Sequence, residues 1–362
     1  MLQDGERRLV TFRVIDAVMR HPNADALDLV QIGGWQCVTK LNEFKVGDSC
    51  IYIEVDSMLP DGNPAWQFLV DKMSRMTPDG KRARLKTIRL RGEYSQGLAL
   101  PLSAFAGQGL VLGGEQSLDE QLNVIKYDPV VSGGPGAKLN GNARGTYPSW
   151  LPKTDLERIE NCFNEMQRLG EDVVWVVEEK LEGSSCTVYS DNGELGITSR
   201  NIDFKLDDDT MQGNAFIDTV REQGLDKIVE IATDRKVAIR GELCGPGIQG
   251  NIYNLDKLRV FVFDVYDGDA GRYLTFDERQ HFLRLLVAAG ADVDVTPIIC
   301  ERTLPTTVQE TVRLADGDSV LRPGQLREGL SWKTQSPVGT GSFKPRMYSF
   351  KSVSRDYLSR EK

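Results

Sequence analysis

The chain has 362 residues and a mass of 40.4 kDa, which is enough for two domains that each bury a hydrophobic core. Hydrophobic residues make up 40% and charged residues 27%, as in ordinary globular proteins, and no apolar run approaches the roughly 20 residues that cross a bilayer. The net charge of −9 argues against a protein that coats nucleic acid indiscriminately. The first residues, MLQDGERRLV, contain no hydrophobic leader, so we expect a cytoplasmic protein without membrane association.

The cysteines and histidines narrow the possible chemistry. Six cysteines are spread singly along the chain without a Cys-x-x-Cys pair, so we expect reduced thiols in the core. The two histidines, His21 and His281, leave little for a His-based zinc site or a His-dependent hydrolase. Catalysis is therefore expected to rest on lysine, arginine and carboxylates.

The N-terminal part of the chain predicts a small all-β barrel followed by a basic strand. Residues 9–58 alternate short β-like runs with turn signals about every ten residues, and a helix is expected over 65–76. Residues 81–91, KRARLKTIRLR, carry six cations and no acid. Cationic and apolar residues alternate here, which predicts one strand with a solvent-exposed cationic face. The alternative interpretation is that this face is only solvated and binds no ligand. We expect this face to bind a nucleic-acid backbone through Arg84, Lys86, Arg89 and Arg91.

A change in composition predicts two domains. Residues 129–147 are rich in Gly, Pro, Asn and Ser, so we place a linker there, between domains at 1–128 and 148–362. A helix is expected to start at a Thr154 cap, with Glu157 completing a capping box, and to end at Gly170. Strands and helices then alternate, which predicts an α+β domain.

Lys180 is the candidate nucleophile. It lies between two predicted strands, 173–177 and 186–189, with a turn over 181–185. We expect partial desolvation to lower its pKa, so that the neutral amine can attack an electrophile near neutral pH. Gly183 would let the backbone approach a phosphate closely. The alternative interpretation is a solvated lysine in a hairpin, and the same Lys-x-x-Gly spacing recurs at Lys138 inside the linker.

Further polar motifs follow Lys180 in a particular order. After EKLEGSS come TSRN around Arg200, GELCGPGIQGNIYNL around Glu242, FVFDV around Phe263, EGLSWK around Glu328, and SFKSVS around Lys351. Over residues 150–358 this order resembles motifs I, Ia, III, IIIa, IV and V of the covalent nucleotidyltransferases, which comprise RNA ligases, DNA ligases and mRNA capping enzymes. The residues within these motifs are most similar to those of RNA ligases.

The N-terminal part is similar to one branch of that superfamily. HPNADALDLVQIGGWQCVT and RLKTIRLRGEYSQGLALPL resemble the OB-fold module that precedes the catalytic domain in the fifth family of ATP-dependent RNA ligases. The resemblance implies an α+β nucleotidyltransferase domain, of the adenylyltransferase or ATP-grasp-like type, behind an N-terminal all-β OB-fold domain. It also implies that Lys180 attacks the α-phosphate of ATP and holds AMP as a phosphoramidate. AMP would then pass to an RNA 5′-phosphate and be displaced by a 3′-hydroxyl, as in RNA repair.

The same resemblance implies roles for the other motif residues. Arg200 would contact the nucleotide, Glu242 the ribose, and Phe263 in preference to Phe261 the adenine face. Binding of the phosphates and of Mg²⁺ or Mn²⁺ would involve Glu182, Gly183, Glu328, Lys333 and Lys351, with Glu182 and Glu328 orienting water on the metal.

One position departs from the pattern. Several relatives have Lys-x-Lys in the last motif, but Ser349 occupies the first place here, and either Lys344 or the metal would have to supply the missing charge. The alternatives to an RNA ligase are a DNA ligase, a capping-type guanylyltransferase, or a catalytically inactive nucleic-acid-binding protein. The expected partner is RNA, as a nicked duplex or splinted ends and including RNA/DNA hybrids, bound by a monomer without a protein partner.

Overall fold

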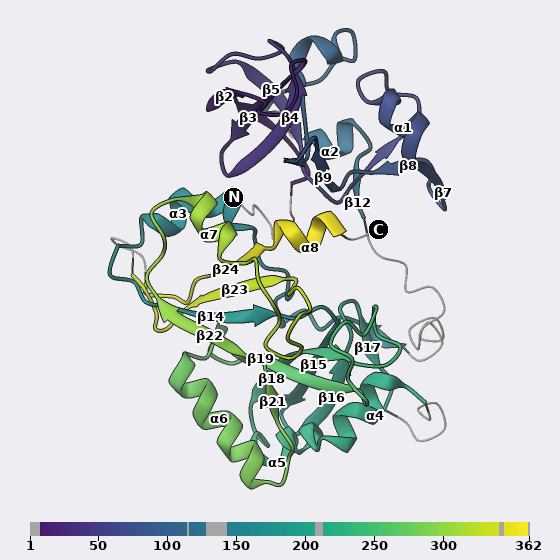
Figure 1. The fold of residues 1–362 in the computed structure, drawn as a ribbon. Coiled ribbons are helices and arrows are strands. Elements are labelled where there is room, and N and C mark those ends of the chain that lie inside the picture. Colours follow the sequence, from purple (N-terminus) through teal and green to yellow (C-terminus); the bar gives the residue numbers. More distant parts are fainter. Residues whose placement is uncertain (1–7, 114–115, 128–142, 207–212, 340–343, 361–362) are drawn as a thin grey trace. The chain divides into compact units, whose positions relative to one another are not determined.

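The computed structural model describes residues 8–113, 116–127, 143–206, 213–339 and 344–360 (Figure 1). The chain divides into two compact units: Met1–Pro129 with Ile159–Phe163 and Leu358–Lys362, and Val130–Arg158 with Asn164–Tyr357. Most of the predicted linker lies outside the described residues, and its last part forms strand β13 (Ala143–Thr146). No helix in the described ranges is long and apolar enough to cross a membrane.

The first unit consists mainly of short antiparallel strands, so the all-β prediction is confirmed. They are β1 (Val10–Val14), β2 (Ala17–Arg20), β3 (Leu27–Ile32), β4 (Trp35–Lys40), β5 (Ser49–Ile53), β6 (Ser57–Pro60), β7 (Ser74–Thr77), β8 (Gly80–Arg84), β9 (Thr87–Leu90), β10 (Glu93–Gln96), β11 (Leu98–Pro101) and β12 (Ile125–Lys126). The helices are α1 (Gln67–Met73), the 3-10 helix η1 (Leu102–Phe105) and α2 (Leu118–Gln121).

Strand β5 organises this unit because both of its faces are buried. It is the middle strand of the sheet β1-β5-β11. Ile51 and Ile53 enter one apolar cluster with Trp66, while Cys50 and Tyr52 enter a second cluster with Trp35. A continuous apolar run such as CIYI is what a strand buried on both faces requires.

Two expectations about the first unit were wrong. The predicted helix over 65–76 is shorter, because the chain passes directly from α1 into strand β7. The predicted single basic strand is two strands, β8 and β9, in different sheets. The break lies at Leu85, which is buried and whose backbone bonds to Ser57 and Asp56. Alternation of cations and apolar residues does not reveal such a change of sheet.

The second unit contains two sheets. One has the order β13-β17-β16-β15-β18-β19-β20, with β21 parallel to β19, and the other has the order β22-β14-β23-β24. The strands after β13 are β14 (Trp175–Lys180), β15 (Ser184–Asp191), β16 (Glu194–Thr198), β17 (Ile202–Phe204), β18 (Lys236–Cys244), β19 (Arg259–Asp267), β20 (Arg272–Tyr273), β21 (Asp294–Val295), β22 (Ile298–Arg302), β23 (Gly329–Thr334) and β24 (Ser349–Val353). The helices after β13 are α3 (Ile159–Gln167), α4 (Ala215–Glu222), α5 (Ile228–Ile231), α6 (Phe276–Ala288), α7 (Val308–Arg313) and α8 (Arg355–Arg360), with the 3-10 helix η3 (Leu225–Lys227). The first part of α3 and the last part of α8 belong to the first unit.

In the larger sheet, one face is covered by helices, and the opposite face carries the polar side chains of the candidate site. Helices α4, α5 and α6 cover one face (Figure 1), where Val188, Ile239 and Val262 join a large apolar cluster. Because side chains alternate along a strand, the opposite face carries polar residues such as Ser185 and Glu242, which are paired across β15 and β18.

The smaller sheet is divided in the same way. Val177, Trp332 and Phe350 form one cross-strand row, and the Trp332 and Phe350 rings stack with centroids 5.4 Å apart. This row fixes the apolar face. The other face carries the rows Val176–Lys333–Ser349, Glu178–Ser331–Lys351 and Lys180–Gly329–Val353.

The helix predicted from Thr154 starts later, at Ile159. The Thr154 hydroxyl lies 3.0 Å from the Ser185 hydroxyl instead of capping a helix. The Lys351 amide donates to the Glu157 carbonyl at 2.8 Å, and Arg158 bridges to Lys351, so this segment runs beside β24. All six cysteines are free; five are buried as expected, whereas Cys300 is exposed.

Candidate active site

Lys180 is the last residue of β14, so the strand predicted over 173–177 extends three residues further and includes the lysine. Its Nζ lies 2.5 Å from Glu328 Oε1, and the two side chains are 28% and 19% exposed. Burial lowers the pKa of Lys180, but Glu328 and Glu242 raise it by more, so this pKa lies above its ordinary value. The expectation of a lowered pKa is therefore wrong for the ligand-free protein, because the Glu328 carboxylate, assisted by Glu242, stabilises the ammonium.

Glu242 lies in β18, and the charges of Glu242 and Lys180 affect each other's pKa. The pKa of Glu242 is raised to about 8, mainly by burial and to a smaller extent by Glu328, although Lys180 and Arg200 act in the opposite direction. Glu242 and Glu328 are thus two acidic groups that face one lysine, and a further cation bound beside them would favour the carboxylate form of Glu242.

Glu182 and Gly183 form the turn after β14. The Tyr357 hydroxyl donates to the Glu182 carboxylate, and the Glu182 amide donates to the Tyr253 oxygen at 2.5 Å. A Cβ at Gly183 would lie 2.5 Å from the Leu243 carbonyl oxygen, so only glycine allows β18 to pack this closely. The glycine thus has a packing reason in addition to the predicted approach to a phosphate.

Arg200 lies in the short connection between β16 and β17, and both its side chain and its backbone carbonyl have partners. Its guanidinium lies 2.5 Å from Asp155 Oδ2, and its carbonyl accepts a hydrogen bond from Lys153 Nζ at 2.9 Å. Burial, followed by Arg200, lowers the pKa of Lys153. The segment from Lys153 to Asp155 therefore fixes the position of the predicted nucleotide contact.

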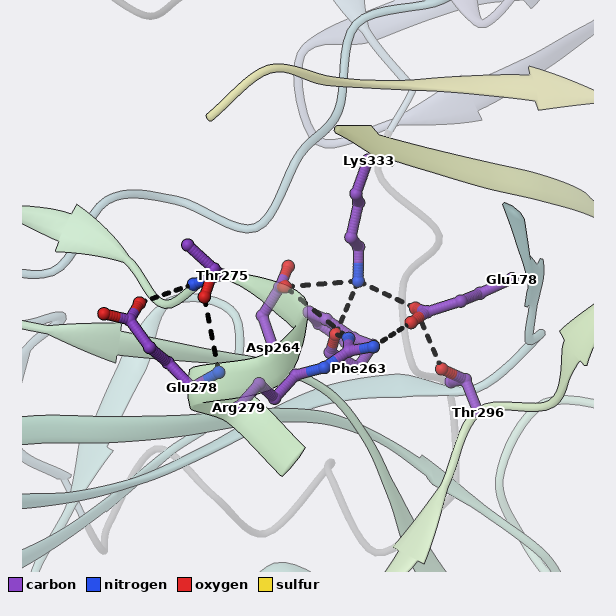
Figure 2. A network of polar contacts seen from close by, with 8 residues as sticks. All are labelled: Glu178, Phe263, Asp264, Thr275, Glu278, Arg279, Thr296 and Lys333. Carbon is purple, nitrogen blue, oxygen red and sulfur yellow. Dashed lines mark hydrogen bonds and ion pairs between the residues drawn. The ribbon is translucent and has the colours of Figure 1, made fainter. Parts of the chain in front are cut away.

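A buried polar network lies beside the predicted adenine contact (Figure 2). Lys333 Nζ lies 2.8 Å from Glu178 Oε2 and 3.2 Å from Asp264 Oδ1. Arg279 from α6 donates to Glu178 and to the Phe263 carbonyl, which Lys333 also contacts. Burial raises the pKa of Glu178, but Lys333 and Arg279 outweigh it and leave this pKa below its usual value. Lys333 is therefore a partner of carboxylates in the ligand-free protein.

Phe263 occupies an irregular position in β19. The register with β18 shifts between the pairs Arg240–Asp264 and Gly241–Val262, so Phe263 is the extra residue of a bulge. Its ring centroid lies 5.4 Å from Lys333 Nζ. Phe261 is buried with Leu181, Cys244 and Tyr253, which leaves Phe263 as the more accessible aromatic ring of the motif.

Lys351 and Ser349 lie in β24 on the same face as Lys180. Lys351 is paired with Ser331, and Ser349 is paired with Lys333. The position where relatives carry an additional lysine is thus the cross-strand neighbour of Lys333. Lys344 is described, but the rest of its Ser-Phe-Lys triplet lies outside the described residues.

The four predicted RNA-binding cations occupy different environments in the first unit. Arg84 pairs with Asp56 at 2.8 Å, and its guanidinium lies 3.8 Å from the Tyr127 ring centroid. Lys86 is partly exposed, and Arg89 stacks on Tyr94 at 4.4 Å. Arg91 is exposed at the tip of the β9–β10 hairpin.

Sequence reasoning missed Asp155, Tyr253, Tyr357 and Arg279. Tyr253 lies inside the motif GELCGPGIQGNIYNL, so it was visible as a candidate. Arg279 lies in an amphipathic helix, where an arginine is normally solvated, and nothing in the local pattern marks it. Across the residues described, no group of three or more His, Cys, Asp or Glu side chains is placed to hold a metal by itself.

A family model described as RNA ligase matches residues 173–353, which contain Lys180 and the carboxylates around it. An apo structure of a variant of Naegleria gruberi RNA ligase is 32% identical to the chain, covers 99% of both chains, and superposes with a TM-score of 0.85. The chain belongs to the RNA ligase family.

Further matches cover both units of the ligase. A model of an OB-fold domain matches residues 9–102. A variant of the Naegleria gruberi enzyme with AMP and Mn is 32% identical, covers 98% of this chain and 99% of that chain, and has a TM-score of 0.86. Another variant, with ATP and Mn, is 32% identical over 98% of each chain, with a TM-score of 0.83. A sequence search of curated proteins gave no significant match. None of the matches described above is to a DNA ligase or a capping-type guanylyltransferase.

Proposed function

We propose that the ligase uses ATP and Mg²⁺ or Mn²⁺ to join RNA 3′-hydroxyl to 5′-phosphate ends, with AMP carried on Lys180. The observation that carries this proposal is the position of Lys180 at the end of β14, in contact with Glu328 and close to Glu242. The related Naegleria gruberi enzyme with the same fold binds ATP, AMP and Mn. Both RNA ligase activity and the ATP and metal requirement agree with these matches.

In the first step, Lys180 Nζ attacks the α-phosphorus of ATP. A P–N bond forms, and the bond between the α-phosphorus and the pyrophosphate oxygen breaks in line with it. The attack needs a neutral amine, whereas the ligand-free site holds the ammonium. Glu328 Oε1, 2.5 Å away, is the group placed to accept the proton.

The carboxylates fit a divalent cation that has few direct protein ligands. Glu182, Glu242 and Glu328 all act electrostatically on the Cys244 thiol, so they lie close together. We propose that Glu182 and Glu328 orient water on the metal and that Glu242 contacts the ribose. Mg²⁺ commonly takes one or two carboxylates, keeps several waters, and completes its shell with substrate phosphates. When bound, the cation supplies positive charge to the triphosphate and offsets the carboxylate charge that keeps Lys180 protonated.

The remaining motif residues are proposed to position the nucleotide. Arg200, held by Asp155, would contact the ribose–phosphate part, and the bulged Phe263 ring would face adenine. Lys351 shares the face of Lys180 and is the proposed phosphate ligand there. The contacts of Lys333 with Glu178 and Asp264 support a role in holding Phe263 more than a direct phosphate contact.

In the later steps, the RNA 5′-phosphate oxygen attacks the phosphorus of lysyl-AMP, and the P–N bond breaks and regenerates Lys180. The RNA 3′-hydroxyl then attacks the 5′-phosphorus and releases AMP. We propose a nicked or splinted duplex, including RNA/DNA hybrids, as the substrate of a ligase acting as a monomer. The cations Lys86, Arg89 and Arg91 of the first unit support a contact with the nucleic-acid backbone.

The direct test is incubation with α-labelled ATP and Mn²⁺, followed by denaturing electrophoresis. We expect label on the wild type that is lost in acid, as for a P–N bond, and no label on Lys180→Ala. Lys138→Ala is the matched control, because it removes the other Lys-x-x-Gly lysine and should leave labelling unchanged. Absence of label on folded wild-type protein, together with RNA binding, would instead identify an inactive nucleic-acid-binding protein.

A further inference from the structure

The β9–β10 hairpin of the first unit turns through Arg91 and Gly92. Leu90 pairs with Glu93, so the connection has two residues. Arg91 has a φ of 51° and Gly92 a φ of 95°. Positive φ at both central positions is the mark of a type I′ turn, in which Asn-Gly is the preferred pair.

An arginine is an unfavourable choice at the first of these positions. A left-handed backbone conformation is disfavoured for residues with a long side chain, and asparagine or glycine adopts it more readily. The arginine therefore does not serve the stability of the turn. Its guanidinium is instead presented at an exposed tip, and strained positions of this kind concentrate where a side chain has a binding role.

A second turn holds the tip in place. His21 is buried and its Nε2 lies 2.9 Å from the Leu90 carbonyl oxygen, while its Nδ1 accepts the Asn23 amide at 3.1 Å. The Asn23 side-chain amide donates to the Arg91 carbonyl at 3.0 Å. These bonds fix the backbone on both sides of the strained φ, so the arginine is presented from a rigid base.

The hairpin also exposes two aliphatic side chains beside its cations. Ile88 and Leu90 alternate with Arg89 and are 40% and 36% exposed. Arg89 is held against the Tyr94 ring on the other face of the ribbon. The tip thus combines the exposed Arg91 with an apolar surface formed by Ile88 and Leu90. Arg89, held by the Tyr94 ring, lies next to them.

We propose that this tip docks on double-stranded RNA, with Arg91 on a backbone phosphate and Ile88 and Leu90 against the wide minor groove. This proposal rests on the proposed RNA substrate and names the form of RNA that the first unit recognises. The minor groove of A-form RNA is wide and shallow and admits a hairpin tip, whereas its major groove is too deep and narrow. Single-strand binders stack bases on aromatic rings, and the exposed apolar side chains of this tip are aliphatic.

The decisive variant is Arg91→Asn, because it separates binding from folding. Asparagine suits the turn better, so the melting temperature should stay the same or rise. Affinity of the full-length ligase for a nicked RNA duplex should fall about tenfold, and the slope of log Kd against log salt should decrease by about one. Lysyl-AMP formation should be unchanged. Leu90→Ser should weaken duplex binding without changing the salt slope.

Lys45→Asn is the matched control, since it removes one exposed cation from another turn of the same unit. It should leave the salt slope close to that of the wild type. Unchanged duplex affinity in Arg91→Asn would overturn the proposal. An equal loss for single-stranded RNA of the same sequence would overturn the choice of duplex. If the wild type forms no lysyl-AMP, the proposed function is refuted, whatever the result for the hairpin.

Discussion

The buried network around Glu178 predicts a large loss of stability when Arg279 is replaced by methionine. The Glu178 and Arg279 side chains are 0% and 7% exposed, and Lys333 is the other cation within 4 Å of Glu178 in the described structure. Removing one partner of a buried ion pair typically costs about 3–5 kcal/mol, because the other charge stays buried. For a unit of this size, the loss corresponds to a fall in melting temperature of about 10 °C.

The control lies close to the same helix. Arg272 and Glu278 form an ion pair at 2.7 Å, but their side chains are 44% and 42% exposed. Arg272→Met should therefore cost no more than about 0.5 kcal/mol. Both variants would be followed by thermal and urea unfolding, using the transition that ATP stabilises.

A second substitution tests the cause of the loss. Glu178→Gln in the Arg279→Met background removes the unbalanced charge, and the new amide oxygen can still accept hydrogen bonds from Lys333 and Thr296, the other partners of this side chain. We expect it to recover about 2 kcal/mol. If Arg279→Met costs no more than Arg272→Met, or if the two substitutions add without recovery, then Lys333 alone balances Glu178 and the reasoning fails.

Two further predictions concern the carboxylates at Lys180. Glu328→Gln removes the carboxylate that contributes most to the raised pKa of Lys180, so an amine-selective reagent should label this lysine several-fold faster near pH 8, even though adenylation falls. Glu301→Gln, at an exposed glutamate, is the control. An unchanged labelling rate in Glu328→Gln would contradict the assignment. Glu242 has a pKa of about 8 in the folded protein against 4.5 as the ordinary value, so its contribution to stability is complete below about pH 4.5 and is lost as the pH rises through 8. Between pH 5 and pH 8 the wild type should lose about 3.5 kcal/mol from this group, so without nucleotide or metal Glu242→Gln should gain about 10 °C in melting temperature relative to the wild type over that range. A constant difference would show that Glu242 is not protonated.

Local patterns in the sequence predicted the parts of the site that depend on neighbouring residues. The apolar runs on either side of Lys180 correctly indicated two strands with this lysine at the end of the first, although β14 begins at Trp175 and continues through the lysine itself. Helices α4 and α6 likewise follow the apolar periodicity of their sequences, and the side chains of Asn214 and Thr275 cap them. Periodicity and caps act over a few residues, so they can be recognised without the tertiary structure.

Properties that depend on distant partners could not be predicted in this way. The pKa of Lys180 is raised by Glu328, which lies 148 positions later in the chain. Arg84 was expected on an exposed cationic face, but Asp56 and Tyr127 hold its guanidinium. Thr154 has the composition of a helix cap, but Ser185 provides a different partner for its hydroxyl. In each case a residue remote in sequence decided between two locally reasonable outcomes.

The aromatic row Val177–Trp332–Phe350 limits how the chain can change in length near the nucleophile. Deleting or inserting one residue within β14 would turn the lysine toward the side packed with tryptophan and phenylalanine, and would bring a valine or a tryptophan to the nucleotide. A change of two residues would keep the two sides apart. Length variation is therefore tolerable beyond the strand ends, for example between β23 and β24, whereas the spacing from Trp175 to Lys180 can change only by an even number of residues.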